Sequence, residues 1–255
     1  MKFTDTHTHL NSEQFDDDRN EMIQRAIDAG VDRLFIPGVD MESAPSMFEV
    51  EKAFPNNVFL MMGLHPTHVK EDFEKELAFV FEQHEKRHFY AVGEIGMDLY
   101  WDKTFVKEQA VAFQKQIQLA KTKNLPINIH CRDAFDETFE VLEEEKGAGL
   151  KGIFHCFTGN LEQAKQAISY NMKLGIGGVV TFKNGKIDKF LNEIPIENIV
   201  LETDAPYLAP TPYRGKRNES AYTVNVAEKL AEIYDYPLSK VAEITNANVK
   251  AIYGL

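Results

Sequence analysis

The chain has 255 residues, of which 44% are hydrophobic and 27% are charged. These proportions are typical of a globular protein and exclude intrinsically disordered and collagen-like chains. Forty acidic residues against 28 basic ones give a net charge of −12, which excludes binding of nucleic acid through a broadly basic surface. Any polyanion must therefore be held locally, and metal ions are one means of holding it.

Features of the whole sequence also indicate a compartment. The chain lacks the run of about 18 apolar residues that a transmembrane helix needs, and its start, MKFTDTHTHL, lacks the apolar core of a secretory signal. Its two cysteines are too few for a disulfide framework. We therefore expect a cytoplasmic protein with no membrane association, and no obligate protein partner is evident.

Short apolar segments rich in β-branched and aromatic residues alternate with helical patterns along the chain. Helical spacing is seen, for example, from Val106 to Ala120 and from Ala227 to Tyr234. We expect eight strands, at residues 2–6, 31–36, 58–64, 88–95, 126–131, 151–156, 173–178 and 198–203. Eight strand–helix units in this length predict an α/β protein with one domain, residues 1–255, folded as a (β/α)8 TIM barrel.

The alternative to the barrel is a doubly wound open sheet. That fold favours a glycine-rich turn after the first strand. Here the first predicted strand ends in His-Thr-His. The barrel is therefore the preferred prediction.

His7 and His9 end the first predicted strand, where alternate side chains point the same way and could face one ion. Short patterns of this kind also arise by chance. Four more side chains suited to metal binding end or follow other predicted strands: Glu94, His130, His155 and Asp204. Active sites of barrels form at these carboxyl ends, and burying such groups there is costly unless they are paired or bound to metal. The six residues therefore predict a metal site.

Six protein ligands exceed the number that one catalytic zinc ion uses. They suit two divalent ions about 3.5–4 Å apart, with the centrally placed Glu94 as the bridge. The alternative is one ion, with His130 and His155 contacting the substrate or supporting other ligands. Imidazole ligands favour Zn, Mn, Fe or Ni over Mg or Ca, although the working ion can still be Mg.

Asp204 is the predicted general base, because a carboxylate next to both metal and water can take the proton of the attacking water. Glu202 lies two residues earlier and therefore on the same side of its strand. It could orient Asp204 or a ligand histidine from behind. A purely structural role for Glu202 is an equal alternative.

Another set of residues is predicted to contact phosphate or substrate: His65, Arg132, Arg214 and Lys216. Arginine suits phosphate recognition, and the RGKR sequence at 214–217 concentrates three cations in an acidic chain. The alternatives are an ion pair of Arg132 with Asp133, a solvated loop at 214–217, and a surface histidine at position 65. Tyr207 and Tyr213 could stack on a base or simply pack their loop. Tyr100 and Trp101 could wall the pocket, or they could pack the loop after Glu94.

Seven sequence motifs together resemble the TatD family of metal-dependent hydrolases. They are DTHTHL (5–10), GLHP (63–66), GEIGMDLY (93–100), IHCRDA (129–134), FHCFTG (154–159), ETDAPYLAP (202–210) and RGKRNE (214–219). They occur in order from end to end, so the resemblance covers the whole chain. Two positions depart from the family pattern: Cys131 stands where serine is frequent, and Ser220 where proline is more usual.

The resemblance implies a divalent-metal DNase of the 3′→5′ exonuclease type, with DNA or short nucleic-acid ends as substrate. It also implies metal-binding roles for the same six residues named above. A metal-dependent amidohydrolase or esterase, acting on a small molecule or on D-aminoacyl-tRNA, is the alternative enzyme. Glu94 occupies the place where many two-zinc amidohydrolases carry a modified lysine, which favours the nuclease. A metal-binding protein without activity is the third possibility.

Overall fold

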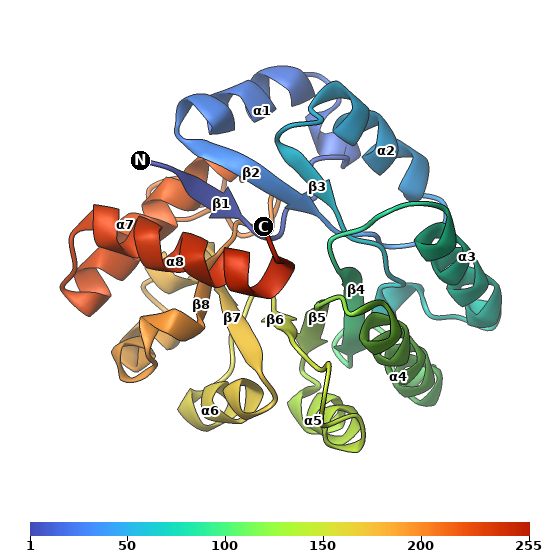
Figure 1. Cartoon of the computed structure of the whole chain (residues 1–255). Coiled ribbons are helices and arrows are strands. Elements are labelled where there is room, and N and C mark those ends of the chain that lie inside the picture. Colours follow the sequence, from blue (N-terminus) through green and yellow to red (C-terminus); the bar gives the residue numbers. More distant parts are fainter.

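The computed structural model describes residues 1–255, and eight parallel strands form its centre (Figure 1). The strands pair in the orders β1-β2-β3 and β4-β5-β6-β7-β8. The two groups join where Gly93 N donates to Met62 O at 3.1 Å and where Thr6 N donates to Leu201 O at 3.0 Å. The ring is therefore closed, and the predicted (β/α)8 barrel is confirmed. The strands are β1 (Phe3–Asp5), β2 (Val31–Ile36), β3 (Val58–Leu60), β4 (Val92–Asp98), β5 (Ile127–Arg132), β6 (Gly152–Phe154), β7 (Met172–Ile176) and β8 (Ile199–Leu201).

Amphipathic helices pack around the ring and cover the outer faces of the strands (Figure 1). After β7, however, the chain forms only short 3-10 helices between Gly178 and Asn198. The sequence GGVVTFKNGK combines glycines with β-branched residues, which disfavour an α-helix there. None of the helices is both long and apolar enough to cross a membrane. The helices are α1 (Arg19–Asp28), α2 (Ala44–Ala53), α3 (Phe73–Lys86), α4 (Val106–Lys123), α5 (Phe135–Glu144), α6 (Leu161–Ser169), α7 (Thr223–Tyr234) and α8 (Leu238–Tyr253).

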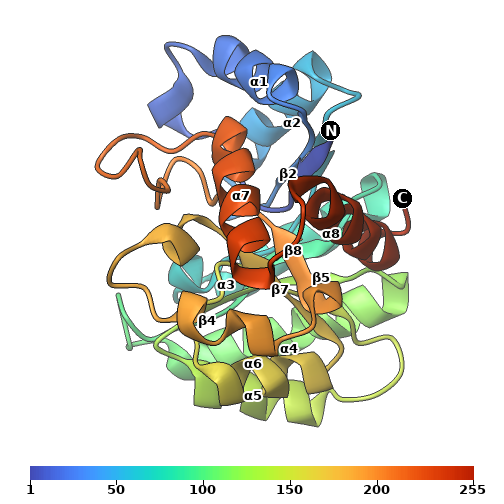
Figure 2. The ribbon, with the colours of Figure 1, turned by 90° about the vertical axis from the view of Figure 1, so that its left-hand side faces the viewer.

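Helix α8 closes the amino-terminal end of the barrel. Its Val249 and Ile252 join a buried cluster with side chains of several strands, and the ring of Tyr253 stacks on Phe35 at 4.2 Å. Figure 2 shows α8 and both chain termini on one side of the molecule, with the long loop after β8 (orange) on the other. The carboxyl-terminal mouth is thus the end left for a site.

Strand β4 is fully buried and extends beyond the predicted range, to Asp98. It approaches β5 so closely that a Cβ atom on Gly96 would lie 2.0 Å from His130 O, and the φ of Gly96 is 139°. Only glycine tolerates this backbone conformation at low cost. The close approach of the two strands brings Glu94 and Asp98 beside His130.

Candidate metal centre

A cleft of about 1150 Å³ opens at the carboxyl-terminal mouth of the barrel. Five of the six residues predicted to bind metal line it: His9, Glu94, His130, His155 and Asp204. His7 lies just beneath, fully buried at the end of β1. The structure therefore brings all six side chains together, although they are spread over nearly 200 residues of sequence.

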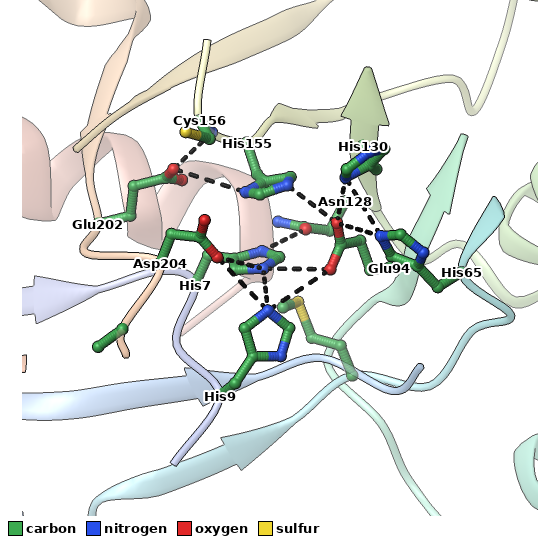
Figure 3. A network of polar contacts seen from close by, with 12 residues as sticks. His7, His9, His65, Glu94, Asn128, His130, His155, Cys156, Glu202 and Asp204 are labelled. Carbon is green, nitrogen blue, oxygen red and sulfur yellow. Dashed lines mark hydrogen bonds and ion pairs between the residues drawn. The ribbon is translucent and has the colours of Figure 1, made fainter. Parts of the chain in front are cut away.

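The first group of ligand atoms surrounds one oxygen of Glu94 (Figure 3). Glu94 Oε2 lies 3.3 Å from His7 Nε2 and 3.8 Å from His9 Nε2. Asp204 Oδ1 lies 3.8 Å and 3.4 Å from the same two nitrogens, which are themselves 3.3 Å apart. Atoms bound at about 2.0 Å to a tetrahedral ion are separated by about 3.3 Å, so these spacings suit one ion.

The second group surrounds the other oxygen of the same carboxylate. Glu94 Oε1 lies 2.8 Å from His130 Nδ1 and 2.9 Å from His155 Nε2. The two groups are adjacent, since the rings of His7 and His155 stack with centroids 3.7 Å apart. Glu94 thus presents one carboxylate oxygen to each of two neighbouring groups of possible ligand atoms.

Partner residues determine which imidazole nitrogen faces the centre. Asn128 Oδ1 lies 2.8 Å from His7 Nδ1, and because this oxygen only accepts, Nδ1 carries the hydrogen. Asp98 Oδ2 lies 2.8 Å from His130 Nε2, and in the same way it accepts the hydrogen carried by that nitrogen. In the neutral rings, the lone pairs of His7 Nε2 and His130 Nδ1 therefore point at Glu94.

The direction of these lone pairs indicates whether the site can hold a cation. Lone pairs of His7 Nε2 and His130 Nδ1 facing a carboxylate repel it unless a cation or a proton lies between them. Glu94 Oε2 is buried and has no hydrogen-bond donor, which is costly for a charged oxygen. Imidazole and carboxylate ligands together suit divalent transition metals. The residues present therefore fit bound divalent ions.

The charges of the cluster are strongly coupled. Burial by itself would raise the pKa of Glu94, yet the imidazoles of His155, His65 and His7 hold it well below its usual range. Burial would lower the pKa of His155, but Glu94 and Glu202 hold it well above its ordinary value. Concentrated negative charge in this pocket thus attracts either protons or metal cations, and metal binding releases protons.

Glu202 is completely buried behind His155. Its Oε1 lies 3.6 Å from His155 Nδ1 and accepts a hydrogen bond from Cys156 N. Its Oε2 has no partner. This arrangement suits the predicted role of orienting a ligand histidine, here His155, and not Asp204.

His65 also faces the centre, but with the ring nitrogen that carries its hydrogen. Its Nδ1 accepts a hydrogen bond from Thr67 N at 3.1 Å, so in the neutral ring Nε2 carries the hydrogen. Burial lowers the pKa of His65 to about 4 and keeps the ring neutral. Nε2 lies 3.2 Å from Glu94 Oε1. His65 thus offers a hydrogen-bond donor, as suits its predicted role of substrate contact.

The predicted phosphate-binding residues separate into two groups. Arg132 lines the cleft, and its guanidinium lies over the Tyr100 ring and pairs with neither Asp133 nor another carboxylate. Arg214 and Lys216 are exposed and lie outside the cleft lining; Arg214 donates to Ala209 O at 2.9 Å and stacks over a phenylalanine ring. A phosphate role for these two remains a prediction, and it would require a substrate longer than the cleft.

Asp98 and Asn128 are contacts of the centre that the sequence analysis missed. Asp98 lies within the quoted motif GEIGMDLY, and Asn128 lies two residues before His130. Alternation along β5 places Asn128 on the same face as His130. A polar residue at that spacing, inside an otherwise apolar strand, was the signal that could have revealed it.

Comparisons with known proteins agree with the geometry of the site. The profile of the TatD related DNase family matches residues 4–254. The uncharacterized metal-dependent hydrolase YabD of Bacillus subtilis (strain 168) is 40% identical over 250 residues, covering 98% of each chain. The 3′-5′ ssDNA/RNA exonuclease TatD of Escherichia fergusonii is 30% identical over 259 residues, again covering 98% of each chain.

Solved structures share the fold over its full extent. The crystal structure of YjjV, a TatD homolog from Escherichia coli K12, has a TM-score of 0.92 and 27% identity, covering 99% of this chain and 98% of that one. The phosphotriesterase homology protein from Escherichia coli has a TM-score of 0.69 at 12% identity and supports the barrel fold alone. The family match, the relatives and the convergence of the six side chains agree, and the chain belongs to the TatD family of metal-dependent hydrolases.

Proposed function

We propose that this hydrolase is a 3′→5′ exonuclease that acts on the ends of single-stranded DNA. The observation that carries the proposal is the pair of ligand groups on the two oxygens of Glu94, in an open cleft that also holds Arg132. Two adjacent ions are the arrangement that phosphodiester cleavage uses. The related exonuclease of Escherichia fergusonii supports the choice of substrate.

In this proposal, six side chains hold the two ions. His7, His9 and Asp204 would hold one ion together with Glu94, and His130 and His155 would hold the other, also together with Glu94. Ions bound there would acidify a water molecule and stabilise the charge on the attacking and leaving oxygens.

Asp204 is the proposed general base. Burial alone would raise its pKa, but a hydrogen bond with His9 and the charges of the neighbouring imidazoles outweigh this effect, and the pKa lies below its usual value. The carboxylate is therefore ionised and can accept a proton from water. Its Oδ1 faces the imidazoles of His7 and His9, which leaves Oδ2 for that proton (Figure 3). The φ of Asp204 is 55°, and such strained backbone is frequent at functional positions.

Two further side chains would bind the substrate phosphate. The Nε2 hydrogen of His65 points into the centre and can donate to a phosphate oxygen. Arg132 supplies a guanidinium, which matches the geometry of phosphate. Both would hold the scissile group while Asp204 acts on water.

The experiment uses a single-stranded oligonucleotide with a 5′ label, incubated with purified protein and Mg²⁺, Mn²⁺ or Zn²⁺. We expect products that shorten stepwise from the 3′ end and an arrest at a 3′-terminal phosphorothioate linkage. Cleavage of p-nitrophenyl esters and not of DNA would overturn the proposal in favour of an esterase. Activity on neither substrate with any ion would indicate a metal-binding protein without this activity.

A further inference from the structure

Two large aromatic side chains stand exposed in the loop that follows β4. Trp101 is 68% exposed and Tyr100 is 52% exposed, and Trp101 lines the same cleft as His130. Leaving a tryptophan in water forgoes the free energy of burying its large apolar surface. The two rings pack edge to face with centroids 4.9 Å apart, and the exposed ring of Trp101 offers a planar ligand a face on which to stack.

The loop is tied directly to the metal centre by Asp98. One carboxylate oxygen, Oδ1, accepts hydrogen bonds from the backbone nitrogens of Tyr100 at 2.9 Å and Trp101 at 3.0 Å. The other oxygen holds His130 Nε2 at 2.8 Å. One buried carboxylate thus fixes both a metal-site histidine and the two aromatic residues, so the rings have a defined position relative to the reacting centre.

Arg132 completes this surface. Its guanidinium carbon lies 3.9 Å from the centroid of the Tyr100 ring and 5.3 Å from that of Trp101. Stacking of this kind holds the plane of the guanidinium while its N–H groups stay available at the edge. Arg132 has no carboxylate partner, although the chain carries 40 acidic residues, and it is the one lysine or arginine that lines the cleft.

We infer that Tyr100, Trp101 and Arg132 form a nucleotide subsite next to the scissile phosphate. The exposed face of Trp101 stacks on an unpaired base, and Arg132 binds the phosphate of the same nucleotide. The inference rests on the proposed exonuclease function and specifies how its substrate is held. A free base face is available in a single strand and not within a duplex, so the subsite selects single-stranded ends and tolerates any base.

Stacking of a base on Trp101 can be tested by measuring KM for two proteins on two substrates. The proteins are the wild type and Trp101→Ala, and the substrates are a single-stranded oligonucleotide and the same chain with abasic sugars at its last three 3′ positions. We expect Trp101→Ala to raise KM for the normal strand roughly tenfold, as loss of one base–aromatic stack does, and we expect the difference between the proteins to shrink on the abasic strand. An equal KM ratio on both substrates would overturn the inference.

A matched control is Tyr236→Ala. Tyr236 is an exposed aromatic residue, 42% exposed, but it lies between α7 and α8 and does not line the cleft. We expect this variant to match the wild type on both strands. A KM increase equal to that of Trp101→Ala would show a general surface effect and would contradict the subsite.

Binding can also be measured without turnover, because Trp101 is the only tryptophan of the chain. In the Asp204→Asn variant with Mg²⁺, thymidine trinucleotide stays intact and should quench the tryptophan fluorescence, whereas an abasic trinucleotide should not. Quenching without hydrolysis by the wild type would refute the exonuclease and retain the subsite. Hydrolysis without quenching would refute the subsite alone.

Discussion

The position of the ring hydrogen on each histidine determines whether that histidine can bind a metal ion at the centre. Asn128 and Asp98 each accept the hydrogen of one histidine, so that His7 and His130 direct lone pairs toward Glu94. These partners touch none of the reacting atoms. They act by fixing the tautomers and ring orientations that metal binding requires.

Replacing Asn128 with leucine should therefore weaken metal binding about 10- to 100-fold, the usual cost of losing such a partner. Leucine has a similar volume but cannot accept the hydrogen of His7 Nδ1. Zinc affinity, measured by competition with a chromophoric chelator, checks this. Asn128→Asp is the matched control, because it keeps an acceptor oxygen and should bind zinc at least as tightly as the wild type. Equal affinity of the leucine variant would show that Asn128 does not position His7.

Removing the carboxylate of Asp204 should abolish hydrolysis while leaving the fold intact. A general base contributes at least about 100-fold to the rate, and Asp204→Ala also removes one side chain from the first ion group. The measurements are kcat on the labelled oligonucleotide and the circular dichroism spectrum. A folded variant that keeps more than about a tenth of the wild-type kcat would exclude Asp204 as the base.

At the scale of elements, the alternation of apolar strands and helices predicted the barrel, because the spacing of buried residues records which face each element turns to the core. The same logic placed His7, His9, His130 and His155 at strand ends. It could not predict Asp98, because the length of β4 depends on how closely Gly96 lets β5 approach. Tertiary contacts of that kind leave no trace in the local pattern.

The loop after β8 illustrates the same limit. Within RGKR, Arg217 pairs with Asp18 at 2.7 Å, and Arg25 of α1 bonds both Asp18 and Glu219. One of the three cations that the sequence suggested for phosphate thus ties the loop to the start of α1. The sequence shows that several arginine and lysine residues are close together, but it does not show which of them form ion pairs in the folded protein.

This network predicts a specific dependence of stability on pH. Hydrogen bonds from Arg217 and Arg25 lower the pKa of Asp18 from 3.8 to about 2. A lowered pKa means that the ionised group stabilises the fold above about pH 4, and this contribution is lost as the pH falls toward 2. Asp18→Asn should therefore lower Tm by a constant, small amount between pH 5 and 8, and the difference should shrink below pH 4. A difference in Tm that is unchanged at pH 3 would exclude the ionised carboxylate as its source.

At the scale of the whole molecule, charge and architecture restrict where a polyanion can bind. The net charge is −12, and α8 fills the amino-terminal end of the barrel. Under the proposed function, ions bound at the centre and Arg132 would attract a nucleic acid, and the net negative charge of the rest of the protein would repel it. We therefore expect the protein to bind a short end and not a long duplex.

The salt dependence of binding measures how many phosphates are held. Each phosphate neutralised on a single strand contributes about −0.7 to the slope of log affinity against log salt. One or two contacts thus predict a slope of about −0.7 to −1.4 for Asp204→Asn binding a fluorescent oligonucleotide at constant Mg²⁺. Adding Arg132→Ala should flatten the slope by about 0.7, since that phosphate contact is lost. Adding Lys216→Ala should leave the slope unchanged if the cleft alone holds the strand, whereas flattening by Lys216→Ala would show that the strand extends onto the loop after β8.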